Sequence, residues 1–256
     1  MYSKEMSRNF LFQFQSNIED VILPETLNNP FGGPIPEVAQ IAARQFQDFI
    51  TTQLPNWEHD FSIHKGKMFG VLVVQTPNKE VGFLATISGK LSGDKTCERF
   101  TPSVFDDATD DFFINKGMKE LTEIGTQIKK SNSSLEILGL KEVRHAKSTA
   151  LQNRLFENYI FVNLKGEKRN VIEIFEDSIH SNPPAAAGEC AAPKLLHFAL
   201  ENNLKPVAIA EFWWGKSPKS EERTHLSYYP ACKNKCRPIL EFILADKTLF
   251  EKRNAL

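Results

Sequence analysis

The sequence predicts an α/β protein in which a sheet is flanked by helices and carries an inserted antiparallel helical hairpin. Two β-rich runs, 67–74 and 81–87, flank a turn and predict a β-hairpin. The stretch 107–159 has helical periodicity with a polar break in its middle. Near the end of the sequence, a helix, a strand and a second helix follow one another. We therefore expect one mixed domain with a helical arm inserted into it.

The 256 residues divide into three parts. Residues 1–106 form an N-terminal α+β part with the β-hairpin, 107–160 form the helical hairpin, and 161–256 form a C-terminal α/β part that completes one domain with 1–106. A composition of 41% hydrophobic and 25% charged residues is typical of a globular protein with a normal core. No apolar run approaches the roughly 20 residues that span a bilayer, and the start lacks a basic and then apolar leader, so we expect a cytoplasmic protein without membrane contact.

The N-terminal part is expected to contain loops and a short strand, then a helix and the β-hairpin. Prolines and glycines interrupt any regular element in the first 35 residues. From Pro36 onward, apolar residues recur every three or four positions, which predicts an amphipathic helix that ends before Pro55. These apolar residues are Val38, Ile41, Ala42, Phe46 and Ile50.

Two antiparallel helices of coiled-coil type are predicted within 107–159. One apolar helical face runs up to the polar break at 131–134 and a similar face resumes after it. The residues of these faces are Leu121, Ile124, Ile128, Leu151, Leu155 and Tyr159. An arm of this kind is typical of a spacer or a docking element, which makes it a candidate contact to another protein.

The C-terminal part is predicted to hold a helix over 191–200, a strand over 206–214 and a second helix from Cys232 onward. Pro193 is tolerated in the first helix because it falls in the first turn.

Three of the four cysteines lie at the starts of these two helices: Cys190 at the first, and Cys232 and Cys236 at the second. The unpaired N–H groups and the dipole of a helix N-terminus lower the pKa of a thiol, so both places favour thiolates. Three thiolates with one open position suit Zn²⁺, which lowers the pKa of a bound water to about 7. Glu189 is adjacent to Cys190 and is the candidate proton carrier.

The cysteines also allow a simpler interpretation. Cys190 can be a small buried residue at a helix start, with Cys232 and Cys236 as free thiols. His197 and His225 are candidates for a fourth ligand. Cys97 lies far away in the sequence and is interpreted as a plain thiol.

A second group of candidate site residues is basic and aromatic. The net charge of −1 excludes a globally basic nucleic-acid binder, but 214–237 holds six basic and two acidic side chains. Aromatic rings beside cations are how single-stranded RNA is bound, although rings on a strand can equally belong to the core. The candidate RNA-binding residues are Trp213, Trp214, Lys216, Lys219, Arg223, Tyr228, Tyr229, Lys233, Lys235 and Arg237.

The order of cysteines and elements is similar to that of zinc-dependent nucleobase deaminases, in which a His or Cys ligand opens one helix, a strand follows, and Pro-Cys-x-x-Cys opens the next helix. The resemblance implies a deaminase-like sheet, with the hairpin at 67–87 as its first two strands. This sequence departs from the family pattern at two points. Ala192 occupies the position of the family's catalytic Glu, and the downstream pair is spaced Cys-x-x-x-Cys.

Several motifs together resemble the N-terminal region that precedes the catalytic domain in long bacterial pseudouridine synthases of the RluA type. They cover about 60–244 and include Gly66–Val74, Gly82–Ala85, Gly188–Leu196, Ala210–Gly215 and Tyr228–Cys232. The synthase motif His-Arg-Leu-Asp does not occur in this sequence, so we expect no synthase activity from it. The resemblance implies a free-standing relative of the accessory region or a piece of a longer protein.

We therefore expect an accessory RNA-recognition domain that helps an RNA-modifying enzyme to bind ribosomal or transfer RNA. A pseudouridine synthase catalytic domain is one candidate partner of its helical hairpin. The alternative is a zinc-dependent, deaminase-like hydrolase that acts on a nucleobase or a nucleotide. A third possibility is a protein-docking module that uses the 107–159 arm.

Overall fold

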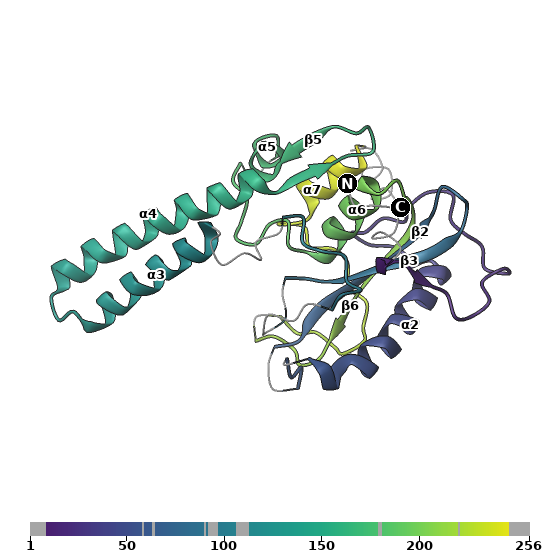
Figure 1. Cartoon of the computed structure of the whole chain (residues 1–256), viewed down its shortest axis with the longest axis horizontal. Helices are drawn as coiled ribbons and strands as arrows, with labels where there is room; N and C mark the ends of the chain where they lie inside the picture. Colours follow the sequence, from purple (N-terminus) through teal and green to yellow (C-terminus); the bar gives the residue numbers. More distant parts are fainter. Residues whose placement is uncertain are drawn as a thin grey trace.

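A computed structural model of the chain describes residues 9–57, 59–62, 65–89, 91, 97–105, 113–178, 181–219 and 221–245. It is a mixed α/β structure, as the sequence predicts (Figure 1). Its main sheet has the strand order β1-β3-β2-β6, and all three pairings are antiparallel. The strands are β1 (Phe12–Gln13), β2 (Lys67–Gln75), β3 (Val81–Ile87) and β6 (Lys205–Trp214).

The predicted β-hairpin is confirmed, since β2 and β3 pair from Phe69 opposite Ile87 to Gln75 opposite Val81. Alternation of side chains along β2 sends Leu72 and Val74 into one core and Val71 and Val73 into another. The sheet thus separates two hydrophobic clusters, one under α6 and one under α2. Figure 1 shows these helices on opposite faces of the sheet.

Helix α2 (Glu37–Gln53) follows the predicted pattern. Pro36 is its N-cap, and its buried residues Val38, Ala42, Phe46 and Ile50 pack in the α2-side cluster. The helix passes into a short 3₁₀ turn, Leu54–Asn56, where Pro55 cannot continue an α-helix.

Helices α3 (Phe113–Lys130) and α4 (Ser134–Asn158) lie side by side and project from the body as an arm (Figure 1). The side chain of Ser133 caps α4 by accepting a hydrogen bond from the backbone of Glu136. Gly117 makes the close approach possible, because a Cβ there would lie 2.6 Å from Leu151. The residues that form the polar break of the sequence, 131–134, thus make the turn and the start of α4.

A two-stranded sheet and a short helix connect the arm to the body. They are β4 (Ile160–Val162), β5 (Lys168–Asn170) and α5 (Val171–Glu176). Helix α5 was not predicted from the sequence. The feature of the sequence that marks the start of α5 is a capping box. In it, the side chains of Asn170 and Glu173 each accept a hydrogen bond from the backbone N–H of the other residue.

Helix α6 (Ala191–Glu201) forms where it was predicted, with Cys190 as its N-cap. Helix α7 (Arg237–Leu244), in contrast, begins later than predicted, and Cys236 is its N-cap. The residues after Cys232 form a turn, closed by a 3.3 Å hydrogen bond from Cys236 N–H to the Cys232 carbonyl. Pro238 sits in the first turn of α7, where its missing N–H costs nothing.

The outer edge of β6 is covered by loops. Asn28 donates to and accepts from the backbone of Ile209, at 3.0 and 2.8 Å. Further along, Trp213 exchanges backbone hydrogen bonds with 226–227, and Tyr229 N–H donates to the Glu211 carbonyl. These bonds satisfy an edge that would otherwise be open to pairing with another strand. No described helix is both long and apolar enough to cross a membrane.

Candidate metal centre

The three C-terminal cysteines converge in space. The Sγ atoms of Cys190, Cys232 and Cys236 all lie within 4.8 Å of one another, which is close enough to hold a metal ion. The Sγ atoms of Cys232 and Cys236 are 3.3 Å apart. Cys236 is buried, Cys190 is half-buried and Cys232 is exposed. The sequence prediction that places these three residues in one cluster is therefore confirmed as a matter of geometry.

The local fold explains how Cys190 reaches the pair. The start of α6 lies directly on β2 at Gly70, where a Cβ atom would be 2.9 Å from the Cβ of Ala191 and 3.1 Å from Leu195. Glycine therefore lets the helix approach the sheet. Cys236 belongs to the same hydrophobic cluster as α6 and α7, which fixes the second helix start against the first.

The thiols control one another's ionisation. Side-chain hydrogen bonds, first with Cys190 and second in size with Cys236, hold the pKa of the Cys232 thiol far below its usual value. Hydrogen bonding to Cys232 raises the pKa of Cys190, and the two other thiols raise the pKa of Cys236. One negative charge, on Cys232, is thus stabilised by two protonated neighbours. A cation beside the other two thiols would favour their ionisation.

None of the candidate fourth ligands joins the cluster among the described residues. Cys97, which was interpreted as a plain thiol and not as a ligand, packs against the α2-side core on the other face of the sheet. His197 is half-buried beside Phe161, its Nδ1 accepts a 3.4 Å hydrogen bond from Val162 N–H, and burial lowers its pKa to about 4. The Nδ1 atom of His225 accepts from Gly215 N–H at 2.9 Å.

Glu189, the predicted proton carrier, contacts the base of the arm. Its Oε1 atom accepts a hydrogen bond from the Tyr159 hydroxyl. Its carbonyl accepts from Gly89 N–H at 2.8 Å. The adjacent Gly188 has a positive φ of 92° and leaves room for the Tyr159 ring.

A second carboxylate, which was not among the residues predicted from the sequence, interacts electrostatically with Cys190 and Cys232 of the cluster. Glu211 is on β6, only 8% exposed, and its Oε1 atom accepts a 3.2 Å hydrogen bond from the backbone N–H of Ala192. Burial, aided by the charge of Cys232, raises the pKa of Glu211 to about 7. The signal in the sequence was a single acidic residue inside an otherwise apolar strand.

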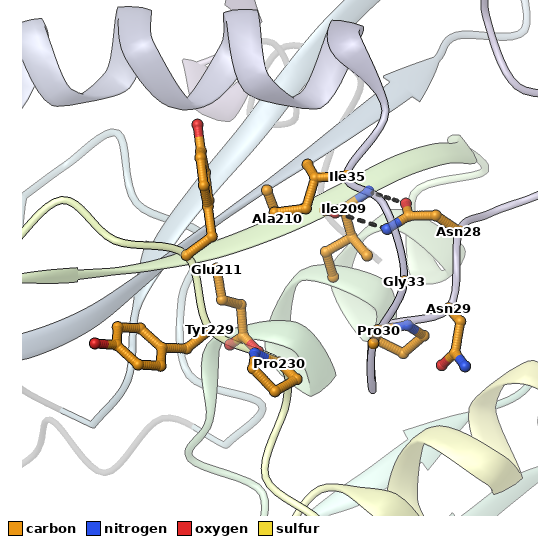
Figure 2. A pocket seen from close by; sticks show the side chains of 12 residues that line it. Asn28, Asn29, Pro30, Gly33, Ile35, Ile209, Ala210, Glu211, Tyr229 and Pro230 are labelled. Carbon is orange, nitrogen blue, oxygen red and sulfur yellow. Dashed lines mark hydrogen bonds between the residues drawn. The ribbon is translucent and has the colours of Figure 1, made fainter. Parts of the chain in front are cut away.

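A pocket of about 220 Å³ opens beside Glu211 at the edge of β6 (Figure 2). Loop 28–33 forms one wall, and Tyr228, Tyr229 and Pro230 form another. A 2.8 Å hydrogen bond from Ala231 N–H to the Pro30 carbonyl joins the two walls next to Cys232. The first 35 residues, expected only to form loops and a strand, thus contribute to the surroundings of the cysteines.

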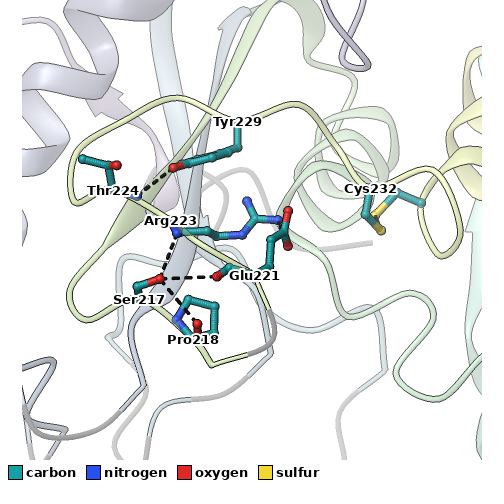
Figure 3. A network of polar contacts seen from close by, with 8 residues as sticks. Ser217, Pro218, Glu221, Arg223, Thr224, Tyr229 and Cys232 are labelled. Carbon is teal, nitrogen blue, oxygen red and sulfur yellow. Dashed lines mark hydrogen bonds and ion pairs between the residues drawn. The ribbon is translucent and has the colours of Figure 1, made fainter.

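Residues 217–219 and 221–229 take part in a local polar network, shown with Cys232 in Figure 3. Arg223 donates to Glu221 at 2.7 Å and lies 4.5 Å from the centre of the Tyr229 ring. The Tyr229 hydroxyl accepts from Thr224 N–H at 2.7 Å. Arg223 and Tyr229, both predicted to contact RNA, therefore contact each other.

The other predicted RNA-binding residues differ in exposure. Trp213 and Trp214 are only 6% and 7% exposed, so the structure places both indoles in the core, which leaves little ring surface for stacking on bases. Arg237 pairs with Glu241 at 3.0 Å. Tyr228 and Lys235 are half-buried, whereas Lys216, Lys219 and Lys233 are exposed.

Comparison of the chain with protein-family models, with curated proteins and with solved structures finds no match.

Proposed function

We propose that the protein is a zinc-dependent hydrolase of the nucleobase-deaminase type, with Cys190, Cys232 and Cys236 as its metal ligands. The observation that carries this proposal is the convergence of three thiols, from the N-caps of α6 and α7 and from the turn that precedes α7. Thiolates are the ligands that Zn²⁺ prefers, and three protein ligands with an open fourth position are typical of catalytic rather than structural sites.

The order of elements supports the deaminase type. A helix (α2), an antiparallel hairpin (β2 and β3), a helix opened by a cysteine (α6), a strand (β6) and a second cysteine-opened helix (α7) follow one another, with the arm between β3 and α6. This is the arrangement implied by the deaminase resemblance. The proposed deaminase-like core is thus 9–105 together with 161–245, and α3 and α4 are its insertion.

The Cys-x-x-x-Cys spacing does not separate the two downstream thiols. The turn closed by Cys236 N–H and the Cys232 carbonyl absorbs the additional residue, and the two sulfurs remain 3.3 Å apart. The cluster is also accessible, since Cys232 is exposed.

Bound Zn²⁺ would supply a water whose pKa is lowered to about 7. In hydrolytic deamination, the oxygen of water bonds to the ring carbon that carries the amino group, the C–N bond breaks, and one proton of the water leaves with the amine as ammonia. The pocket of about 220 Å³ would accept the reacting edge of a base.

Ammonia release tests the proposal. Zinc-loaded protein is incubated with cytosine, adenine and guanine and with their nucleosides, and Cys190→Ser is the comparison. We expect release from at least one of these substrates, and its loss in the variant. The hydrolase proposal is wrong if the zinc-loaded protein releases none, or if Cys190→Ser releases as much as the unaltered protein.

RNA recognition is a second candidate function, favoured by the exposure of Lys216, Lys219 and Lys233. These cations take part in no ion pair among the described residues, so they remain available to phosphates. This proposal retains the accessory role implied by the resemblance to the pseudouridine synthase region.

Filter binding to ribosomal and transfer RNA tests this second role. Changing Lys216, Lys219 and Lys233 to Glu is expected to abolish binding. The matched control changes three exposed lysines of the arm, Lys119, Lys129 and Lys141, to Glu. Equal loss in both variants would indicate a non-specific charge effect and contradict recognition by this segment.

A further inference from the structure

We propose that Glu211 is the catalytic proton carrier of the cysteine-bound metal site. Its side chain extends from β6 to the start of α6, where Ala192 occupies the position of the glutamate that the deaminase pattern leads one to expect. This inference rests on the proposed zinc function and assigns the acid–base residue that the function requires.

The first argument is position. The backbone N–H of Ala192 is two residues beyond Cys190, and the Oε1 atom of Glu211 lies 3.2 Å from it. In the deaminase pattern, a glutamate side chain starts from this backbone position. The Glu211 carboxylate is therefore in contact with the residue that would have carried the missing carboxylate.

The second argument is how the strand aims this side chain. Glu211 lies on the α6-side face of β6, opposite Gly70 in the β2–β6 register. A Cβ at Gly70 would lie 3.5 Å from the Cγ of Glu211. The absence of a side chain at position 70 thus leaves room for both the start of α6 and the glutamate.

The third argument is that Glu211 has no ion-pair partner among the described residues. A buried carboxylate is costly unless it is paired. Arg223, a cation close enough to influence its pKa, is paired with Glu221. Glu211 interacts electrostatically with both Cys190 and Cys232, which places its charge near the proposed metal.

The role follows from proton balance. Glu211 accepts one proton from the attacking water and passes it to the amino group, which leaves as ammonia, while the oxygen of the water stays on the ring carbon. The carboxylate ends the cycle as it began. A carboxylate that is only 8% exposed and is held by the backbone N–H of Ala192 is positioned to accept and then donate this proton.

Cobalt substitution tests this role without knowledge of the substrate. The d–d absorption of the Co²⁺-loaded protein is titrated with pH for the unaltered chain, Glu211→Gln and Glu189→Gln. We expect two coupled steps in the unaltered chain, from the carboxylate and the metal-bound water. Glu211→Gln should retain one step, with its midpoint about one unit lower, because a negative neighbour that opposes hydroxide formation is removed. Glu189→Gln should titrate like the unaltered chain.

The outcomes separate the two proposals. If the unaltered protein binds no Co²⁺ in a thiolate site, the proposed function is wrong. If it binds Co²⁺ but Glu211→Gln titrates identically, or if Glu189→Gln removes the step instead, the assignment of Glu211 is overturned and the metal site stands. A Glu211→Gln variant that folds yet loses its Co²⁺ would also overturn the assignment, because Glu211 would then be needed for the architecture of the site.

Discussion

Glu211 on β6 accepts a 3.2 Å hydrogen bond from the backbone N–H of Ala192 in the first turn of α6. This bond joins the strand to the helix that presents Cys190, so it holds a buried acidic group beside the start of that helix. Glu189, although adjacent to Cys190 in sequence, interacts with Tyr159 at the base of the arm. Spatial and sequence proximity therefore favour different acid–base residues.

Removal of one buried ligand is expected to abolish metal binding. Cys236→Ser replaces a cysteine that is 1% exposed and shares the cluster with Cys190 and Cys232. We expect stoichiometric zinc in the unaltered protein and a loss of most of it in the variant, by elemental analysis. Cys97→Ser is the matched control, because Cys97 packs on the opposite face of the sheet. Equal zinc content in both variants would rule out the cysteine cluster as the binding site.

Zinc affinity is expected to fall steeply as the pH decreases. The pKa values of Cys190 and Cys236 are raised, so both are protonated near neutral pH and must lose their protons when the metal binds. Release of two protons changes the apparent affinity about 100-fold per pH unit. Competition with a chromophoric chelator between pH 6 and pH 8 measures this slope. A slope near zero would show that fewer than three thiolates bind the ion.

Glycine at position 70 is expected to be necessary for the position of α6. Gly70→Ala would place a methyl group 2.9 Å from the Cβ of Ala191, which should cost about 1–3 kcal/mol of unfolding free energy and weaken zinc binding. Gly139→Ala, at an exposed position in the second turn of α4 with no atom within 4 Å, should instead gain about 0.5–1 kcal/mol. Urea denaturation measures both. Similar effects of the two changes would contradict the close contact at Gly70.

The stability of the metal-free protein is expected to depend on Glu211 between about pH 4.5 and pH 7. An exposed glutamate has a pKa of 4.5, whereas the pKa of Glu211 in the folded chain is about 7, so folding favours its protonated form. Its contribution to stability is therefore complete below pH 4.5 and is lost as the pH rises through 7. The loss is about 3 kcal/mol by linkage.

The difference in unfolding free energy between the unaltered chain and Glu211→Gln isolates this effect. A difference is needed because His197, whose pKa is lowered to about 4, has the opposite dependence over nearly the same interval. The difference should decline from pH 4.5 to pH 7 and then become constant. A difference that does not vary with pH would show that the Glu211 carboxyl is not perturbed by burial.

Local patterns were sufficient to predict much of the fold. The apolar repeat from Val38 to Ile50 predicted α2, and the β-rich runs around 75–80 predicted the β2–β3 hairpin. The helix signal arises from burial of one face of a segment, and the strand signal arises from burial of both faces; the sequence records each of them directly. The start of α7 was predicted too early. The residues after Cys232 form a turn closed by the Cys236 N–H, and the helix begins only at Arg237.

The site could be predicted only in part. The three cysteines were recognisable because thiols at two helix starts are unusual in a core. Glu211 was not recognisable, because its importance depends on the contact between β6 and α6, which are packed together by tertiary structure. The burial of Trp213 and Trp214 likewise depends on loops that cover the β6 edge, far beyond any local pattern.

X-ray absorption at the zinc edge of the purified protein tests the central proposal most directly. The proposed site predicts three sulfur ligands at about 2.3 Å and one oxygen or nitrogen ligand at about 2.0 Å, the latter from exchangeable water. Four sulfur ligands would indicate a closed, structural site, and the absence of zinc would contradict the metal centre altogether.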